Sequence, residues 1–171
     1  SQKRINEFLK EKSEIINELK GFKKINGKIE FKNVSFIYRE SKIQALENIS
    51  FNINNKKSLG LIGVTGSGKT TLLRLITRSF NIDSGNILID DKKISEFNIE
   101  SLRKQIGIVP QDSFLFSDSI INNIRFGNEK ASIKEIKQIC KIAGIHKEII
   151  KFKDGYETIL GERGVNLSGG Q

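Results

Sequence analysis

The chain has 171 residues, of which 37% are apolar and 29% are charged, a composition that fits one soluble globular domain and excludes a disordered chain. No apolar run approaches the roughly 20 residues of a membrane span, and no signal peptide opens the sequence, so we expect the chain itself to be soluble. The formal net charge of +9 at pH 7 fits a nucleic acid or an anionic membrane, but the lysines are scattered, which favours a solvated surface and no nucleic-acid partner. The only cysteine, Cys140, cannot form an internal disulfide, which indicates a reducing, cytoplasmic compartment.

The first part of the sequence predicts a helix followed by antiparallel strands. Apolar residues recur at three-and-four spacing over residues 1–20, which predicts an amphipathic helix that ends at Gly21. A helix boundary near Ser13 is an alternative. The period then changes to two, so residues 29–38 and 49–53 are predicted to be antiparallel strands.

The rest of the sequence predicts an α/β unit followed by helices. Residues 57–64 are apolar at consecutive positions, which predicts a strand buried on both faces, and the helical spacing of 69–80 predicts a helix behind it. Further short strands are expected at 85–90 and 106–111, and helices at 118–124 and 132–152, the latter broken at Gly144.

A phosphate-binding motif joins the buried strand to the helix. The stretch from Gly63 to Thr70 satisfies GxxxxGK[ST], in which glycines let backbone N–H groups surround a phosphate at a helix N-terminus. Lys69 is expected to reach the β and γ phosphates, and Thr70 to place its hydroxyl on Mg²⁺. The alternative is a Gly-rich turn that binds nothing. The predicted nucleotide-binding residues here are Gly63, Val64, Thr65, Gly66, Ser67, Gly68, Lys69, Thr70 and Thr71.

Once this loop is placed, nearly the whole chain resembles the nucleotide-binding domain of ATP-binding cassette (ABC) transporters. The resemblance is closest to the exporter type, in which that domain is fused behind a transmembrane domain. The stretch "IEFKNVSFIY" is similar to the opening strand of the family, which implies that Tyr38 stacks on adenine. From the residues alone, a core tyrosine on a strand is an equally good interpretation.

The segment "DSGNILIDDKKISEFNIESLRKQIGIVPQD" resembles the family segment that runs into the Q-loop. The resemblance implies that Gln111 approaches Mg²⁺ and the attacking water, and that its loop contacts a transmembrane partner. An amide suits both roles because it has an acceptor for the metal and a donor for water. Without the family, a polar residue that ends a strand explains Gln111 as well.

The end of the sequence, "GVNLSGGQ", resembles the ABC signature, and the segments before it resemble the exporter helical subdomain. In the family, the signature binds the γ-phosphate of ATP held on the opposite domain, which suits small residues at a helix start. This implies nucleotide-binding roles for Ser168, Gly169, Gly170 and Gln171. A lone His146 and the lone Cys140 are assigned to helix packing or the surface.

The resemblance implies an α/β P-loop NTPase of the ABC ATPase type, with a mixed sheet. Residues 1–25 are expected to be a linker helix from a membrane domain, whose apolar face packs on its own domain or on a partner. Residues 26–171 are expected to be a partial nucleotide-binding domain, with an antiparallel β part at 26–57, a RecA-like core at 58–112 and a helical subdomain at 113–171.

The C-terminal part of that core is absent from the sequence, including the strand with the Mg²⁺-binding Asp, the catalytic Glu and the switch His. We therefore expect no meaningful ATP hydrolysis by this chain. The strands at 57–64 and 106–111 are expected to stand apart or to be repaired by another chain, unless the native protein continues beyond Gln171.

The leading functional hypothesis is the ATP-hydrolysing motor domain of a membrane exporter, which binds ATP and Mg²⁺ at the cytoplasmic face. Two such domains, identical or related, are expected to close head to tail over ATP. An ATPase of DNA repair or chromosome maintenance is an alternative, although no heptad run separates loop and signature. A soluble ribosome-associated ABC protein and an inactive product that sequesters a partner domain are the others. The transported substrate has no signature in this sequence.

Overall fold

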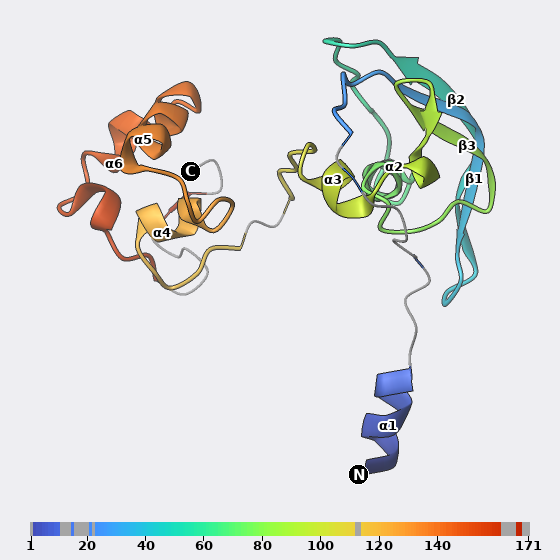
Figure 1. Cartoon of the computed structure of the whole chain (residues 1–171), viewed down its shortest axis with the longest axis horizontal. Coiled ribbons are helices and arrows are strands. Elements are labelled where there is room, and N and C mark those ends of the chain that lie inside the picture. Colours follow the sequence, from blue (N-terminus) through green and yellow to red (C-terminus); the bar gives the residue numbers. More distant parts are fainter. Residues whose placement is uncertain are drawn as a thin grey trace. The chain divides into compact units, whose positions relative to one another are not determined.

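The computed structural model describes residues 2–10, 15, 21, 23–111, 114–161 and 167–168 (Figure 1). The chain divides into two compact units, unit 1 (Ser1–Gly107) and unit 2 (Ile108–Gln171), and each is described by itself.

Unit 1 is built on a four-stranded antiparallel sheet in the order β2-β1-β3-β4. Its strands are β1 (Ile29–Tyr38), β2 (Ile43–Ile53), β3 (Ser84–Ile89) and β4 (Lys92–Lys93). Phe31, Val34 and Phe36 of β1 lie in the core. Alternation places Val34 and Phe36 on the same face, and a register shift between Phe31 and Val34, where Asn33 has φ 49°, brings Phe31 to that face as well. The strands expected at 29–38, 49–53 and 85–90 are thus confirmed, with β2 beginning earlier than predicted.

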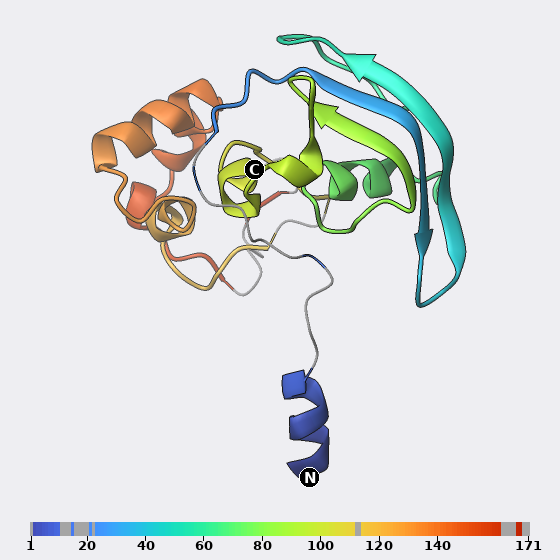
Figure 2. The same ribbon diagram turned by 45° about the vertical axis from the view of Figure 1, so that its right-hand side comes forward.

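Helices pack on the concave face of this curved sheet (Figure 2). They are α2 (Lys69–Ile76), the short 3-10 turn η1 (Ile94–Glu96) and α3 (Ile99–Arg103). The shared core contains Phe31, Val34, Phe36, Leu46, Leu72, Leu75, Ile87, Ile89, Ile94, Phe97 and Leu102.

A separate helix, α1 (Gln2–Lys10), confirms the first part of the predicted N-terminal helix. Its apolar side chains are exposed, with 78% of Phe8 and 73% of Leu9 accessible. Most of residues 11–20, which were expected to continue this helix, lie outside the described residues.

Two strand predictions are wrong, and the described sheet is therefore antiparallel rather than mixed. Residues 57–64 and 106–111 are irregular, and apart from the half-buried Ile106 their large side chains are exposed, with Ile62 102% and Val109 95% accessible. A buried strand needs neighbours to accept and donate its backbone hydrogen bonds. In the sheet that the structure describes, neither segment has a paired strand.

Unit 2 is helical, as predicted, with α4 (Ile120–Arg125), α5 (Ile133–Ile142), α6 (His146–Ile149) and the 3-10 turn η2 (Gly155–Glu157). Ser119 caps α4, and Ser132 with Glu135 forms a capping box at α5. None of the described helices is long and apolar enough to cross a bilayer. The core of unit 2 contains Ile120, Ile121, Ile136, Cys140, Ile149, Tyr156 and Leu160.

Candidate functional site

The Gly-rich loop of unit 1 leads directly into α2, as the motif predicts. Ser67 closes a turn by donating its N–H to the carbonyl oxygen of Val64 at 3.2 Å. Gly68 is the N-cap of α2 in the left-handed conformation, with φ 87°, and no side chain caps the helix. Because the first N–H groups of a helix have no intrahelical acceptor, the N-terminus of α2 is left available to an anion.

The Lys69 ammonium bridges this loop. It donates to the carbonyl oxygens of Gly63 and Val64, both at 2.7 Å, and to Ser67 Oγ at 3.3 Å. Three donors of one ammonium thus contact three acceptors of the loop. The positive charge is held where the open helix N-terminus also attracts an anion.

Close packing constrains two glycines of the loop, Gly68 against backbone and Gly63 against the end of a serine side chain. A Cβ at Gly63 would lie 2.6 Å from Ser67 Oγ, and a Cβ at Gly68 would lie 2.5 Å from the carbonyl oxygen of Ala45 in β2. The loop is therefore pressed against β2 at one end and folded tightly on itself at the other.

Tyr38 lies at the end of β1 beside the start of α2. Its hydroxyl shares a hydrogen bond of 3.0 Å with Thr71 Oγ1, and Thr71 is buried. The ring makes edge-to-face contacts with Phe36 and Phe80, at centroid distances of 4.9 and 5.4 Å. Tyr38 also lines a pocket of about 440 Å³ together with Arg74 and Phe80. The structure thus brings Tyr38 next to the phosphate loop, and a flat ring borders a hollow of ligand size.

The described side chains would bind a divalent cation only together with oxygen atoms of a bound phosphate ligand. Thr70, predicted to bind Mg²⁺, is exposed on the first turn of α2. Among the described residues, no three His, Cys, Asp or Glu side chains gather as a metal site would require. Mg²⁺ keeps few protein ligands and takes substrate phosphates as the others, which suits a hydroxyl beside a phosphate loop.

The remaining predicted site residues belong to unit 2. Gln111 is exposed near the start of that unit, and Ser168 is exposed near its end. Leu167, which precedes Ser168, packs against the core of unit 2. Three predicted signature residues, Gly169, Gly170 and Gln171, lie outside the described residues.

An exposed aromatic patch follows Gln111, and sequence reasoning did not single it out. It consists of Phe114, Phe116 and Phe126, which are 63%, 43% and 72% accessible. Their rings contact one another, with Phe116 4.8 Å from Phe126 and 5.1 Å from Phe114. Clustered exposed aromatic side chains mark surfaces that bind partners. The stretch "FLF" could have indicated this patch, because Leu115 packs against the core of unit 2 while the two phenylalanines beside it are exposed.

Two arginines that the sequence did not single out hold the far end of α2. Arg103 donates to the carbonyl oxygens of Thr77 and Arg78, both at 2.9 Å, and Arg78 donates to that of Phe97 at 3.0 Å. Burial, and then the nearby charge of Arg103, lower the pKa of Arg78. Cations at a helix C-terminus satisfy its unpaired carbonyls and oppose its dipole. The helix that carries Lys69 is therefore fixed at its other end.

Comparison with known proteins places these features in a family. Residues 46–171 match the sequence model of the ABC transporter family. The chain is 49% identical over 148 residues to the uncharacterised ABC transporter ATP-binding protein YfiB of Bacillus subtilis, covering 86% of this chain and 26% of the relative. It is 50% identical over 147 residues to the multidrug resistance-like ATP-binding protein MdlA of Buchnera aphidicola, covering 86% of this chain and 25% of that relative.

A solved structure of a bacterial Atm1-family ABC exporter with ATP bound has a TM-score of 0.90 and 34% sequence identity, covering 99% of this chain and 30% of that chain. The match confirms the expected ABC ATPase fold. The chain spans about a quarter of the length of these curated relatives.

Proposed function

Because the chain belongs to the ABC transporter family, we propose that it binds ATP and Mg²⁺ at the N-terminus of α2, as the motor part of a longer membrane exporter. The observation that carries this proposal is the bridging of the loop by Lys69 at the uncapped start of α2. A phosphate chain carries several negative charges, and this site offers an ammonium, a helix dipole and backbone N–H groups together.

Each predicted site residue has one role in this proposal. The amides of residues 63–71 surround the phosphates, Lys69 neutralises the β and γ phosphates, and Tyr38 stacks on the base. Thr70 holds Mg²⁺, which when bound balances the charge of the β and γ phosphates. Gln111 offers its amide to the metal and to the attacking water.

The partners follow from the signature and from the relatives. Ser168, Gly169, Gly170 and Gln171 bind the γ-phosphate of ATP on a second nucleotide-binding domain, which packs head to tail on this one. In the longer protein, ATP hydrolysis drives transport, and the domain works at the cytoplasmic face of the membrane. The aromatic patch near Gln111 is the surface that we assign to the transmembrane partner. The DNA-maintenance and ribosome-associated alternatives are not favoured, because the similar proteins are named as transport ATP-binding proteins and an exporter.

Titration of the isotope-labelled chain with ATP and Mg²⁺, followed by amide resonances, tests the proposal. We expect the largest shifts at residues 63–71 and at Tyr38, because both lie beside the start of α2. AMP with Mg²⁺ is the control, since it keeps the base but lacks the β and γ phosphates. Equal shifts with AMP, or shifts that spare residues 63–71, would contradict a triphosphate site at this loop.

A further inference from the structure

The segment before β1 is held in place by side chains from distant parts of unit 1. We call residues 23–28 the N-terminal strap. No strand of the sheet that the structure describes pairs with it, and its backbone bonds instead to Asp90, Ser101 and Gln105. The strap lies between the N-terminal residues and the sheet, so it fixes where the preceding chain enters the domain.

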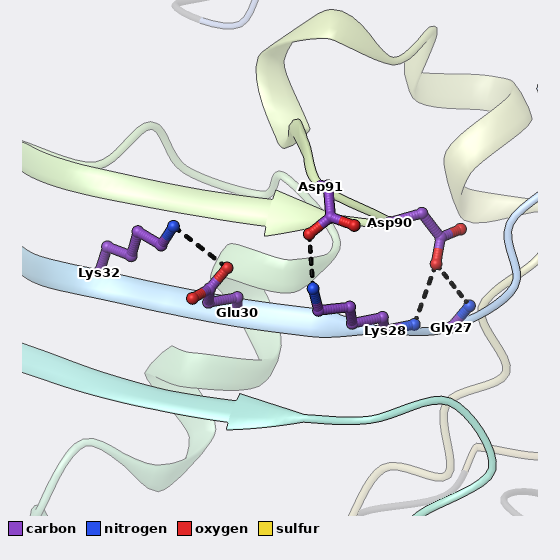
Figure 3. Close-up of polar contacts among 6 residues, drawn as sticks. All are labelled: Gly27, Lys28, Glu30, Lys32, Asp90 and Asp91. Carbon is purple, nitrogen blue, oxygen red and sulfur yellow. Dashed lines mark hydrogen bonds and ion pairs between the residues drawn. The ribbon is translucent and has the colours of Figure 1, made fainter.

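Asp90 holds the end of the strap that is next to β1 (Figure 3). Its carboxylate accepts N–H groups from Asn26 at 2.6 Å, Gly27 at 3.1 Å and Lys28 at 3.0 Å. The Asp90 N–H also donates to the carbonyl oxygen of Lys28 at 2.9 Å. Hydrogen bonds to a charged acceptor are the stronger kind, so Asp90 supplies much of the hold on this end.

The conformation of Asp90 is unusual for a residue with a side chain. Asp90 and Asp91 have φ values of 49° and 64° and form the two-residue turn between β3 and β4. Turns with two left-handed residues favour Asn or Gly, because a Cβ costs free energy there. Asp91 makes one exposed ion pair of 2.5 Å with Lys28. The two aspartates therefore share a backbone conformation and differ in their bonds to the strap.

Gln105 and Ser101 hold the other end. Gln105 Oε1 accepts the N–H of Ile25 at 2.9 Å, while Gln105 Nε2 donates to the carbonyl oxygens of Lys23 at 2.8 Å and Ser101 at 2.9 Å. Ser101 Oγ accepts the N–H of Lys23 at 3.2 Å. An amide side chain thus supplies both the acceptor and the donor that a neighbouring strand would supply.

An apolar contact and a cation–π contact add to this attachment. The Ile25 side chain packs against the core of unit 1, and the Lys23 ammonium lies 4.9 Å from the centre of the Phe97 ring. Ser101 lies within α3 and Gln105 follows it, and the chain then leads on to Gln111. The strap is therefore bonded directly to the segment that runs into the predicted Q-loop.

We propose that Asp90 and Gln105 are positioning residues: Asp90 fixes the N-terminal strap to the β3–β4 turn and Gln105 fixes it to α3, so that the strap and α3 move as one body. Displacement of the chain before residue 23 then reaches α3, and through it the segment that ends at Gln111. The hydrogen bonds of the strap do not depend on the proposed function, whereas a role of this coupling in transport rests on it.

Hydrogen exchange of the 171-residue chain, read by mass spectrometry, tests the coupling with two matched variants. Asp90→Gly and Asp91→Gly both suit the left-handed turn, but only the first removes the carboxylate that accepts backbone N–H groups of the strap, whereas Asp91 contacts only the Lys28 side chain. We expect Asp90→Gly to speed exchange at residues 25–28 by about tenfold or more. Because the strap is bonded to α3, exchange at residues 101–105 rises with it. Asp91→Gly leaves both segments unchanged, and Asp90→Asn, which keeps one acceptor oxygen, restores part of the protection.

A second pair of variants tests the end of the strap that Gln105 holds. Gln105→Leu is expected to speed exchange at residues 23–26, while Lys104→Leu, at the neighbouring exposed position, does not. Faster exchange of the strap with unchanged exchange at 101–105 in Asp90→Gly would overturn the coupling. Equal acceleration in β1 and β2 would also overturn it, because general destabilisation would then explain the result. ATP affinity, measured on the same samples, is expected to stay unchanged, so a failure here is separable from a failure of the proposed function.

Discussion

Alanine at Gly68 is predicted to destabilise unit 1 far more than alanine at Gly66. Both glycines have left-handed backbones, with φ 87° and 84°, so both substitutions carry the cost of a Cβ in that region, about 1–2 kcal/mol. They differ in space, because a Cβ at Gly68 meets the Ala45 carbonyl oxygen at 2.5 Å and a Leu46 methyl at 2.8 Å, whereas Gly66 has nothing within 4 Å.

Overpacking of this kind costs about 1–3 kcal/mol. We therefore expect Gly68→Ala to lower the free energy of unfolding by about 2–5 kcal/mol and Gly66→Ala by about 1–2 kcal/mol. Effects on the unfolded chain are the same for both substitutions and cancel in the comparison.

Urea unfolding followed by far-ultraviolet circular dichroism measures both variants, and Gly66→Ala is the matched control. The packing of the loop against β2 also fixes the start of α2, so Gly68→Ala is expected to weaken ATP binding as well. Equal losses of stability in the two variants would refute the reasoning, because the contact with Ala45 would then have no energetic consequence.

Two further predictions concern the tyrosines. Tyr38→Phe removes the hydrogen bond to the buried Thr71 hydroxyl, so we expect the free energy of unfolding in urea to fall by about 1–2 kcal/mol. ATP affinity is expected to stay nearly unchanged, because the ring face remains. A large loss of affinity would show that the hydroxyl contacts the nucleotide. Burial, and then the hydrogen bond to Cys140, raise the pKa of Tyr156 from 10.0 to about 12. The contribution of Tyr156 to the free energy of unfolding is therefore fully present below pH 10 and is lost as pH rises towards 12. Tyr156→Phe should not show this loss, and a wild-type chain that keeps its stability over this pH range would contradict the prediction.

The phosphate loop was predictable because its chemistry is local. Glycines, Lys69 and Thr70 lie within a few positions of one another, and the structure confirms that they turn into a helix start. Helix caps such as Ser132 and Glu135 are local for the same reason. Patterns of period two also sufficed to locate β1, although a register shift between Phe31 and Val34 interrupts the period of its buried residues.

The bonds that hold the N-terminal strap, which sequence reasoning missed, depend on partners far along the chain. Asp90 bonds to Asn26 across 64 positions, and Gln105 bonds to Ile25 across 80. No spacing rule relates such residues, and each looks like an ordinary polar surface residue in the sequence. The wrong strand predictions have the same origin, since residues 57–64 are apolar enough for a strand but lack a neighbour in the described sheet. Apolar runs predict burial, whereas a strand also requires pairing.

The most direct test of the central claim is calorimetric titration of ATP and Mg²⁺ into the chain and its Lys69→Ala variant. Lys69 is the charged group that spans the loop, so its removal is predicted to weaken binding about 10- to 100-fold, the loss expected for hydrogen bonds from a charged donor. Lys104→Ala, which removes an exposed lysine at the end of α3, controls for net charge and is predicted to bind as the wild type does. Equal affinity of the wild type and Lys69→Ala, with both chains folded, would contradict a nucleotide site at this loop.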